Sequence, residues 1–156
     1  SQLIWSLAEA DTPYATITTS GKLTARQVPT AVTVTVTGRV VGNEDRVTVT
    51  HKVTILPKVT QLQIMNGLSV LADSENGALN GRTVYVDTAS TDTLSLCART
   101  YPADAAEGIS WSSSSTKIAS VDKYGVVTGK KNGTVTITAT AADGSGKKAT
   151  FKLTVY

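Results

Sequence analysis

The stretch GVVTGKKNGTVTITATA, residues 125–141, decides the fold class of this chain. In its second half, every second residue from Val135 to Ala141 is apolar, and the residues between them are threonines. A period of two places alternate side chains on opposite faces of a β-strand, so this segment predicts a strand with one buried face. Residues 21–38, GKLTARQVPTAVTVTVTG, repeat the same design.

Each of these two strands is followed by a turn and by a second alternating strand. In the second half of the chain the turn is ADGSGKK and the strand covers residues 149–155. In the first half the turn is VGNEDR and the strand covers residues 47–55. Valine and threonine are β-branched and favour extended backbone, and no window carries a helical apolar stripe. The sequence predicts an all-β chain.

The pattern is a tandem repeat of domain length. Trp5 matches Trp111, and Gly21 matches Gly125. A repeat of this length indicates two domains rather than the short units of a solenoid. Pro57, in the stretch LPKVT, marks the junction between them.

Residues 59–156 carry a set of positions that are specific in combination. They are Leu96, Ala98, Thr100, Pro102, Trp111, Ser112, Ser113, Ile118, Ala119, Val121, Gly125, Val127, Thr128, Gly133, Ile137, Ala139, Leu153 and Val155. This set resembles the bacterial Ig-like domain of group 2. The resemblance implies two tandem Ig-like β-sandwich modules. Residues 1–57 are then a partial module with the later strands only, and residues 58–156 are a complete module with an inserted hairpin or flap around 67–90.

Two opening strands are expected in the complete module, at residues 59–66 and 93–101. The segment between them contains Asn76-Gly77 and Asn80-Gly81, which are strong turn signals. The residues expected to point inward are Leu94, Leu96, Ala98, Trp111, Ala119, Val121, Val135, Ile137, Phe151 and Leu153.

The residues that most invite a chemical role are better explained by the fold. Trp5 and Trp111 are expected in the sandwich cores rather than stacked on a sugar. His51 occupies the position of Phe151, and no Ser-His-Asp or Cys-His pattern can be assembled around it. The single Cys97 falls on the outward phase of its strand and has no disulfide partner. We therefore expect no catalytic residue and no enzyme.

No metal or cofactor site is expected. The paired carboxylates all fall in predicted loops: Asp73 with Glu75, Asp104 with Glu107, and Glu44 with Asp45. The stretch DSENG lacks the D-x-D-x-D-G spacing of a calcium loop and its distant glutamate.

Charge and hydropathy exclude two classes of partner. The net charge is only +3. The doublets Lys130-Lys131 and Lys147-Lys148 lie at opposite ends of the strand 133–141, about 25 Å apart at about 3.3 Å per residue. A nucleic-acid partner is therefore not expected. No apolar run approaches the roughly 18 residues that a membrane span needs. The N-glycosylation sequon at Asn132 is explained by an Asn-Gly turn at the start of a strand.

The resemblance implies a function outside the cell. Modules of this kind belong to bacterial surface and secreted proteins, to intimin- and invasin-like adhesins, and to some phage virion proteins. The leading interpretation is a non-enzymatic spacer or adhesion module with a host, glycan or cell-wall ligand, whose binding residues the sequence does not identify. Alternatives are a phage virion decoration and a carbohydrate-binding module of a secreted glycan-active enzyme. The latter needs clustered tyrosines from Tyr14, Tyr85, Tyr101, Tyr124 and Tyr156.

The truncated first module predicts a partner of its own. The chain begins in mid-pattern at Ser1, as expected of a fragment of a longer protein. Without its opening strands, the first module is expected to leave an edge unpaired, and Trp5, Val34, Val36 and Val53 are expected to lack part of their facing sheet. We expect either self-association with a second copy, or the segment 67–90, to cover this gap.

Overall fold

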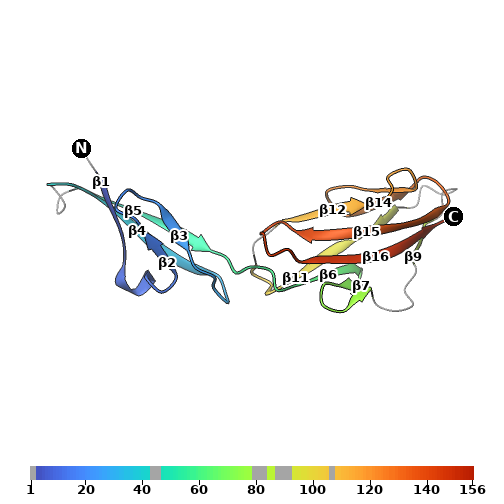
Figure 1. The fold of residues 1–156 in the computed structure, drawn as a ribbon, viewed down its shortest axis with the longest axis horizontal. Coiled ribbons are helices and arrows are strands. Elements are labelled where there is room, and N and C mark those ends of the chain that lie inside the picture. The colour runs from blue at the N-terminus through green and yellow to red at the C-terminus, as the bar shows by residue number, and fades with distance from the viewer. Residues whose placement is uncertain (1–2, 43–46, 79–83, 87–92, 106–107) are drawn as a thin grey trace. The chain divides into compact units, whose positions relative to one another are not determined.

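The chain folds as two separate β-units, described here from a computed structural model (Figure 1). The structure describes residues 3–42, 47–78, 84–86, 93–105 and 108–156, with the backbone alone at 78 and 84–86. Unit 1 is Ser1–Lys58 and unit 2 is Val59–Tyr156. Among the described residues, the one helical element is a 3-10 turn at Glu9–Asp11. The all-β class and the tandem arrangement are confirmed.

Unit 1 consists of a three-stranded sheet and a hairpin. Its strands are β1 (Leu3–Leu7), β2 (Ala15–Ile17), β3 (Leu23–Ala25), β4 (Val32–Val40) and β5 (Thr48–Ile55). The sheet has the order β1-β4-β5, and β2 pairs with β3. Ala15, Val28, Val34 and Ile55 form a small buried core. Alternate apolar residues of β4 thus bury one face, as their period predicts.

Unit 2 is a larger sandwich. Its strands are β6 (Gln61–Asn66), β7 (Ser69–Asp73), β8 (Gly77–Ala78), β9 (Val84–Val86), β10 (Thr93–Ser95), β11 (Cys97–Tyr101), β12 (Ile109–Ser113), β13 (Ala119–Val121), β14 (Val126–Gly129), β15 (Gly133–Ala141) and β16 (Lys148–Val155). They form sheets of order β12-β15-β16-β9, β11-β6-β7-β8 and β10-β14-β13.

The core of unit 2 contains every residue that was expected to point inward. Buried members are Leu96, Ala119, Val135, Ile137, Phe151 and Leu153, and partly buried members are Leu94, Ala98, Trp111 and Val121. The strand register proposed from the sequence is confirmed for these positions.

The expectation of one continuous strand at residues 93–101 is wrong. β10 pairs with β14, whereas β11 pairs with β6 in another sheet. The chain changes sheets at Leu96, which is buried and whose amide donates to the Gly125 carbonyl at 3.0 Å. Gly125 has φ +84°, and a Cβ there would lie 2.6 Å from the Leu96 carbonyl oxygen. Only glycine fits this corner without strain.

The described part of segment 67–90 builds onto unit 2 itself. β7 pairs with β6, β8 pairs with β7, and β9 pairs in parallel with β16. Its described strands therefore complete the sheets of their own unit, and the expectation that segment 67–90 covers unit 1 stays a prediction. Residues 79–83 and 87–90 lie outside the described part of the chain.

A buried carboxylate holds β7 against β6. Asp73 is 4% exposed and accepts hydrogen bonds from Gln61 Nε2 at 2.6 Å, Gln63 Nε2 at 2.8 Å and the Glu75 amide at 2.8 Å. Burial raises the pKa of Asp73, but the hydrogen bonds from Gln63, Glu75, Gln61 and Asn76 outweigh it and hold the pKa below its ordinary value. The ionised carboxylate is the form that the fold stabilises.

The entry into unit 2 is fixed in a similar way. The Val59 amide donates to Asp143 Oδ2 at 2.6 Å, and the Thr60 amide donates to the Tyr101 carbonyl at 2.8 Å. Burial raises the pKa of Asp143, but the hydrogen bonds from Ser145 and Val59 outweigh this effect, so the pKa is lowered from its ordinary value. The first strand of unit 2 is thus anchored at its start by the 142–147 turn.

Replacing Trp111 with alanine tests the core of unit 2. Trp111 packs partly buried against that core, so its truncation is expected to lower the free energy of unfolding by about 3 kcal/mol, the lower end for large aromatics. Urea denaturation followed by circular dichroism measures the change. Tyr124→Ala, at a residue 72% exposed, is the control and should stay within about 0.5 kcal/mol of wild type. Equal losses in the two variants would contradict the proposed register.

Replacing Asp73 with asparagine tests the buried carboxylate. The asparagine amide would face N–H donors, so the free energy of unfolding should fall by about 1–3 kcal/mol at neutral pH. Because the folded-state pKa of Asp73 is lowered, its contribution is fully present above the ordinary carboxylate pKa and is lost as pH falls through the folded-state pKa. The difference in free energy of unfolding between wild type and Asp73→Asn should therefore shrink as the pH is lowered from neutral to acid. Glu75→Gln, at an exposed neighbour, should match wild type at neutral pH.

Candidate functional site

The two units share one framework, with β1, β4 and β5 corresponding to β12, β15 and β16. Trp5 lies opposite Gly38 in the register of unit 1, and Trp111 lies opposite Ala139 in unit 2. Val36 pairs with His51 where Ile137 pairs with Phe151. The repeat seen in the sequence is therefore a repeat of strand pairing.

The same turn precedes β3 and β14, although its hydrogen-bonding residue differs. In unit 1, Thr18 Oγ1 accepts from the Lys22 amide at 3.0 Å. In unit 2, Asp122 Oδ1 accepts from the Val126 amide at 2.9 Å. Each turn brings a glycine with positive φ against the tryptophan of its own unit, Gly21 in the first of them.

The units differ in what covers this framework. On β16, Ala149, Phe151 and Leu153 are at most 2% exposed. On β5, Val49 is 51% exposed and His51 is exposed as well. β6, β7 and β8 pack against β16, and the described residues of unit 1 provide no counterpart of these strands. The first part of the inward phase of β5, at Val49 and His51, therefore faces solvent, whereas Ile55 at its end is buried.

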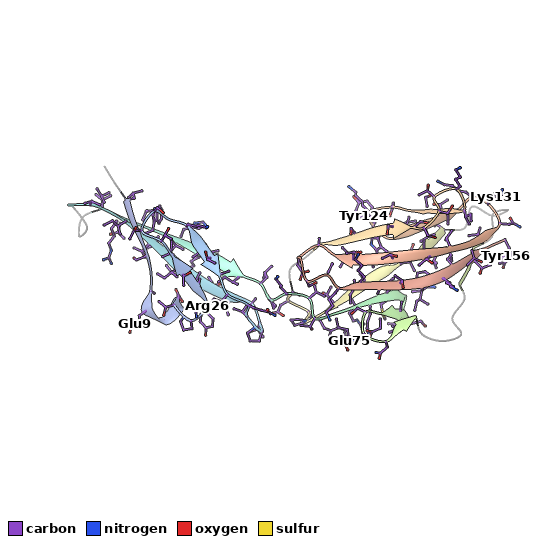
Figure 2. The ribbon with its side chains drawn as sticks, viewed as in Figure 1. Glu9, Arg26, Glu75, Tyr124, Lys131 and Tyr156 are labelled. Carbon is purple, nitrogen blue, oxygen red and sulfur yellow. The ribbon has the colours of Figure 1, made fainter. Side chains whose placement is uncertain are left out.

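This uncovered region contains a hollow of about 260 Å³. Its lining residues are Trp5, Ile17, Gly21, Leu23, Val36, His51 and Val53. A second hollow of about 390 Å³ shares Trp5 and Ile17 and reaches Arg26, which is labelled in Figure 2. We call the residues that line the first hollow the open face. It is the candidate binding surface of unit 1.

The sequence located the open face but misjudged its extent. Val34 and Val36 were expected to lack part of their cover, but they are 0% and 7% exposed. Val34 belongs to the core that β2 and β3 help to form. Exposure falls instead on Val47 and Val49, because the hairpin does not extend over the start of β5.

The residues considered for catalysis are not assembled into a reactive group. His51 lines the hollow with apolar neighbours and Trp5. Cys97 is exposed on β11, as its outward phase predicted. His51 belongs to unit 1 and Cys97 to unit 2. Within the residues that the structure describes, no catalytic arrangement is seen around either of them.

The carboxylates and lysines occupy separate positions. The carboxylate of Asp73 accepts hydrogen bonds from its amide partners. Glu44, Asp45 and Glu107 lie outside the described residues. In the described part of the chain, no three His, Cys, Asp or Glu side chains are placed to hold a metal ion. The two lysine doublets flank opposite ends of β15, as predicted.

The tyrosines come from separate parts of the chain. Tyr14 belongs to unit 1, and Tyr101 ends β11 beside the start of β6. Tyr124 lies in the turn between β13 and β14, and Tyr156 follows β16 at the C-terminal end (Figure 2). The Lys123 ammonium lies 4.9 Å from the centre of the Tyr124 ring and covers one of its faces. The side chain of Tyr85 lies outside the described part.

No helix among the described residues has the length and apolar character needed to cross a bilayer.

Comparison with known proteins finds a family match within unit 2. Residues 82–151 match the model of the bacterial Ig-like domain, group 2. A lacto-N-biosidase of Bifidobacterium bifidum is 34% identical over 99 residues, which are 63% of this chain and 8% of the enzyme. A 3-O-alpha-D-galactosyl-alpha-L-arabinofuranosidase of Bifidobacterium longum subsp. longum is 45% identical over 65 residues, 41% of this chain and 6% of the enzyme. The chain thus spans less than a tenth of each of these relatives.

A solved structure matches this chain at low similarity. It is the C-terminal 282-residue fragment of intimin in complex with the intimin-binding domain of its translocated receptor. The sequences are 20% identical, the TM-score is 0.43, and the alignment covers 97% of this chain and 50% of the fragment. The family match lies within unit 2: residues 82–151 of this chain are similar to the bacterial Ig-like domain of group 2.

Proposed function

We propose that the chain is a non-catalytic spacer or adhesion module of a bacterial cell-surface or secreted protein. One observation carries the proposal: apolar side chains fill the space between the sheets of unit 2, and threonine occupies the outward positions of β15. The outward threonines of β15 are solvated without adding charge and retain a high strand propensity, as suits a structural module. It works outside the cell, with a host, glycan or cell-wall ligand.

The organisation proposed for the chain follows from the comparison of its two halves. Residues 1–57 act as a partial Ig-like module that retains the later strands, and residues 58–156 act as a complete module with an insertion around 67–90. The shared pairing of Trp5 with Gly38 and of Trp111 with Ala139 supports this division. A series of such modules separates the functional ends of a long protein.

The glycosidase relatives support a second candidate function. Their names describe enzymes that act on lacto-N-biose and arabinofuranose structures, and the chain matches only 8% and 6% of their lengths. A piece of this size serves such an enzyme as an accessory, either by spacing its domains or by binding glycan. The scattered tyrosines favour spacing, because sugar-binding faces generally present aromatic rings together.

Glycan titration separates the two candidates. The whole chain is titrated with lacto-N-biose and with an arabinofuranose-containing oligosaccharide, and ¹H–¹⁵N spectra are followed. The spacer function predicts no saturable shift at millimolar sugar, and no release of sugar over prolonged incubation. Saturable binding that Tyr124→Ala or Tyr156→Ala abolishes would assign carbohydrate binding instead.

A surface-display experiment measures adhesion directly. Bacteria that display the chain are compared with bacteria that display an unrelated Ig-like domain, on host cells and on isolated cell wall. Equal attachment supports spacing, whereas saturable extra attachment that soluble chain competes away identifies adhesion.

Release of sugar in the glycan titration would contradict the non-catalytic proposal altogether.

A further inference from the structure

The hollow of unit 1 lies beside a strand with a free edge. β3 pairs with β2 and, among the described residues, with no other strand. Gly21, which precedes β3, and Leu23, which begins it, both line the hollow. A free strand edge offers backbone N–H and C=O groups to an added strand, and an adjacent apolar hollow offers places for its side chains.

Unit 2 shows what occupies the equivalent place. β10 pairs with β14, the counterpart of β3, with Leu94 opposite Val127. Two residues after Leu94, the amide of Leu96 donates a hydrogen bond to the carbonyl of Gly125, which is the counterpart of Gly21. Leu94 and Leu96 then pack into the core of unit 2. One strand thus supplies both the backbone pairing and two apolar side chains.

The hollow in unit 1 is continuous with an existing core. Leu23 and Val53 line the hollow and also pack against the buried residues of unit 1. Apolar side chains inserted there would extend the interface that already joins the β2–β3 hairpin to the sheet. The gain comes from removing apolar surface from water at about 25 cal/mol per Å².

The charges favour an uncharged strand over a second copy of this face. The residues lining the two hollows include His51 and Arg26 and no carboxylate. A two-fold contact would place residues of the same linings against one another, and neither lining contains a carboxylate that could pair with Arg26. A strand with leucine at its inward positions introduces no charge into the hollow.

We infer that the open face is a docking groove for a β-strand from a polypeptide outside residues 1–156. The strand pairs antiparallel with the free edge of β3 and sets two leucine-type side chains, two residues apart, against Trp5 and His51. Its pattern is that of residues 93–96, in which small polar residues alternate with leucine.

A peptide with the sequence TLSLSARTY tests this inference. It is residues 93–101 with Cys97 replaced by serine, to prevent oxidation. The control peptide TLSSLARTY has the same composition but places its two leucines on opposite faces of the strand, so they cannot both enter the hollow in any register. Titrated into the whole chain, the first peptide should give saturable ¹H–¹⁵N shifts at Leu23, Thr24, Ala25 and the Trp5 indole. The control should give none at the same concentration.

Two variants of the chain locate the binding. His51→Lys places a charge in the hollow at a residue that is already exposed, and should weaken peptide binding at least tenfold. Thr50→Lys adds the same charge on the opposite face of β5 and should leave binding unchanged. Each peptide is also joined to the N-terminus by a flexible linker, which raises its effective concentration to the order of millimolar. The tethered first peptide should slow hydrogen exchange at β3.

Three results would overturn the inference. One is the absence of a saturable response to both the free and the tethered first peptide. Another is an equal response to the two peptides, which would mean that the placement of both leucines on one face does not matter. The third is a concentration-dependent dimer that His51→Lys abolishes, which would assign the open face to a second copy of the chain.

Discussion

Both units depend on the burial of one face of an alternating sheet beneath a second sheet. Alternation supplies the apolar face but does not cover it, and an uncovered face forfeits most of the free energy that folding gains from apolar burial. Unit 2 meets this constraint within its own chain, so that Phe151 is 2% exposed. Unit 1 meets it only where β2 and β3 lie over β4, so Val34 is buried while Val49 is half exposed.

The sequence was sufficient for those features that follow from local pattern. The period of two in β15 and β16 identified their buried faces, and the matched tryptophans and glycines identified the repeat. The Trp–Gly contact needs a ring and a residue without Cβ at a fixed separation, so it leaves a readable signature. The turn that precedes β3 or β14 leaves no such signature, because Thr18 and Asp122 make the same hydrogen bond with different side chains.

Features that depend on pairing between distant segments could not be predicted in the same way. Alternation across residues 93–101 is consistent with one strand, yet Leu96 carries the chain from one sheet to another. The inward phase is unbroken there, so composition holds no trace of the change. The extent of the open face escaped prediction for a related reason. The alternation in β5 predicts which side chains share a face. How many of them are covered depends on the length of the facing β2–β3 hairpin.

The recognition that such a fold supports differs from that of a catalytic site. Unit 2 has its inward positions filled with apolar groups, and its buried carboxylate, Asp73, is saturated by amide donors. Binding must then rely on loops, on outward threonines or on an incomplete sheet. In unit 1 the third option is present, because the free edge of β3 and the hollow beside Gly21 offer backbone pairing and shape together. Specificity there would come from which alternate side chains of the added strand face the hollow. The same alternation between two faces is what predicts a β-protein from the sequence.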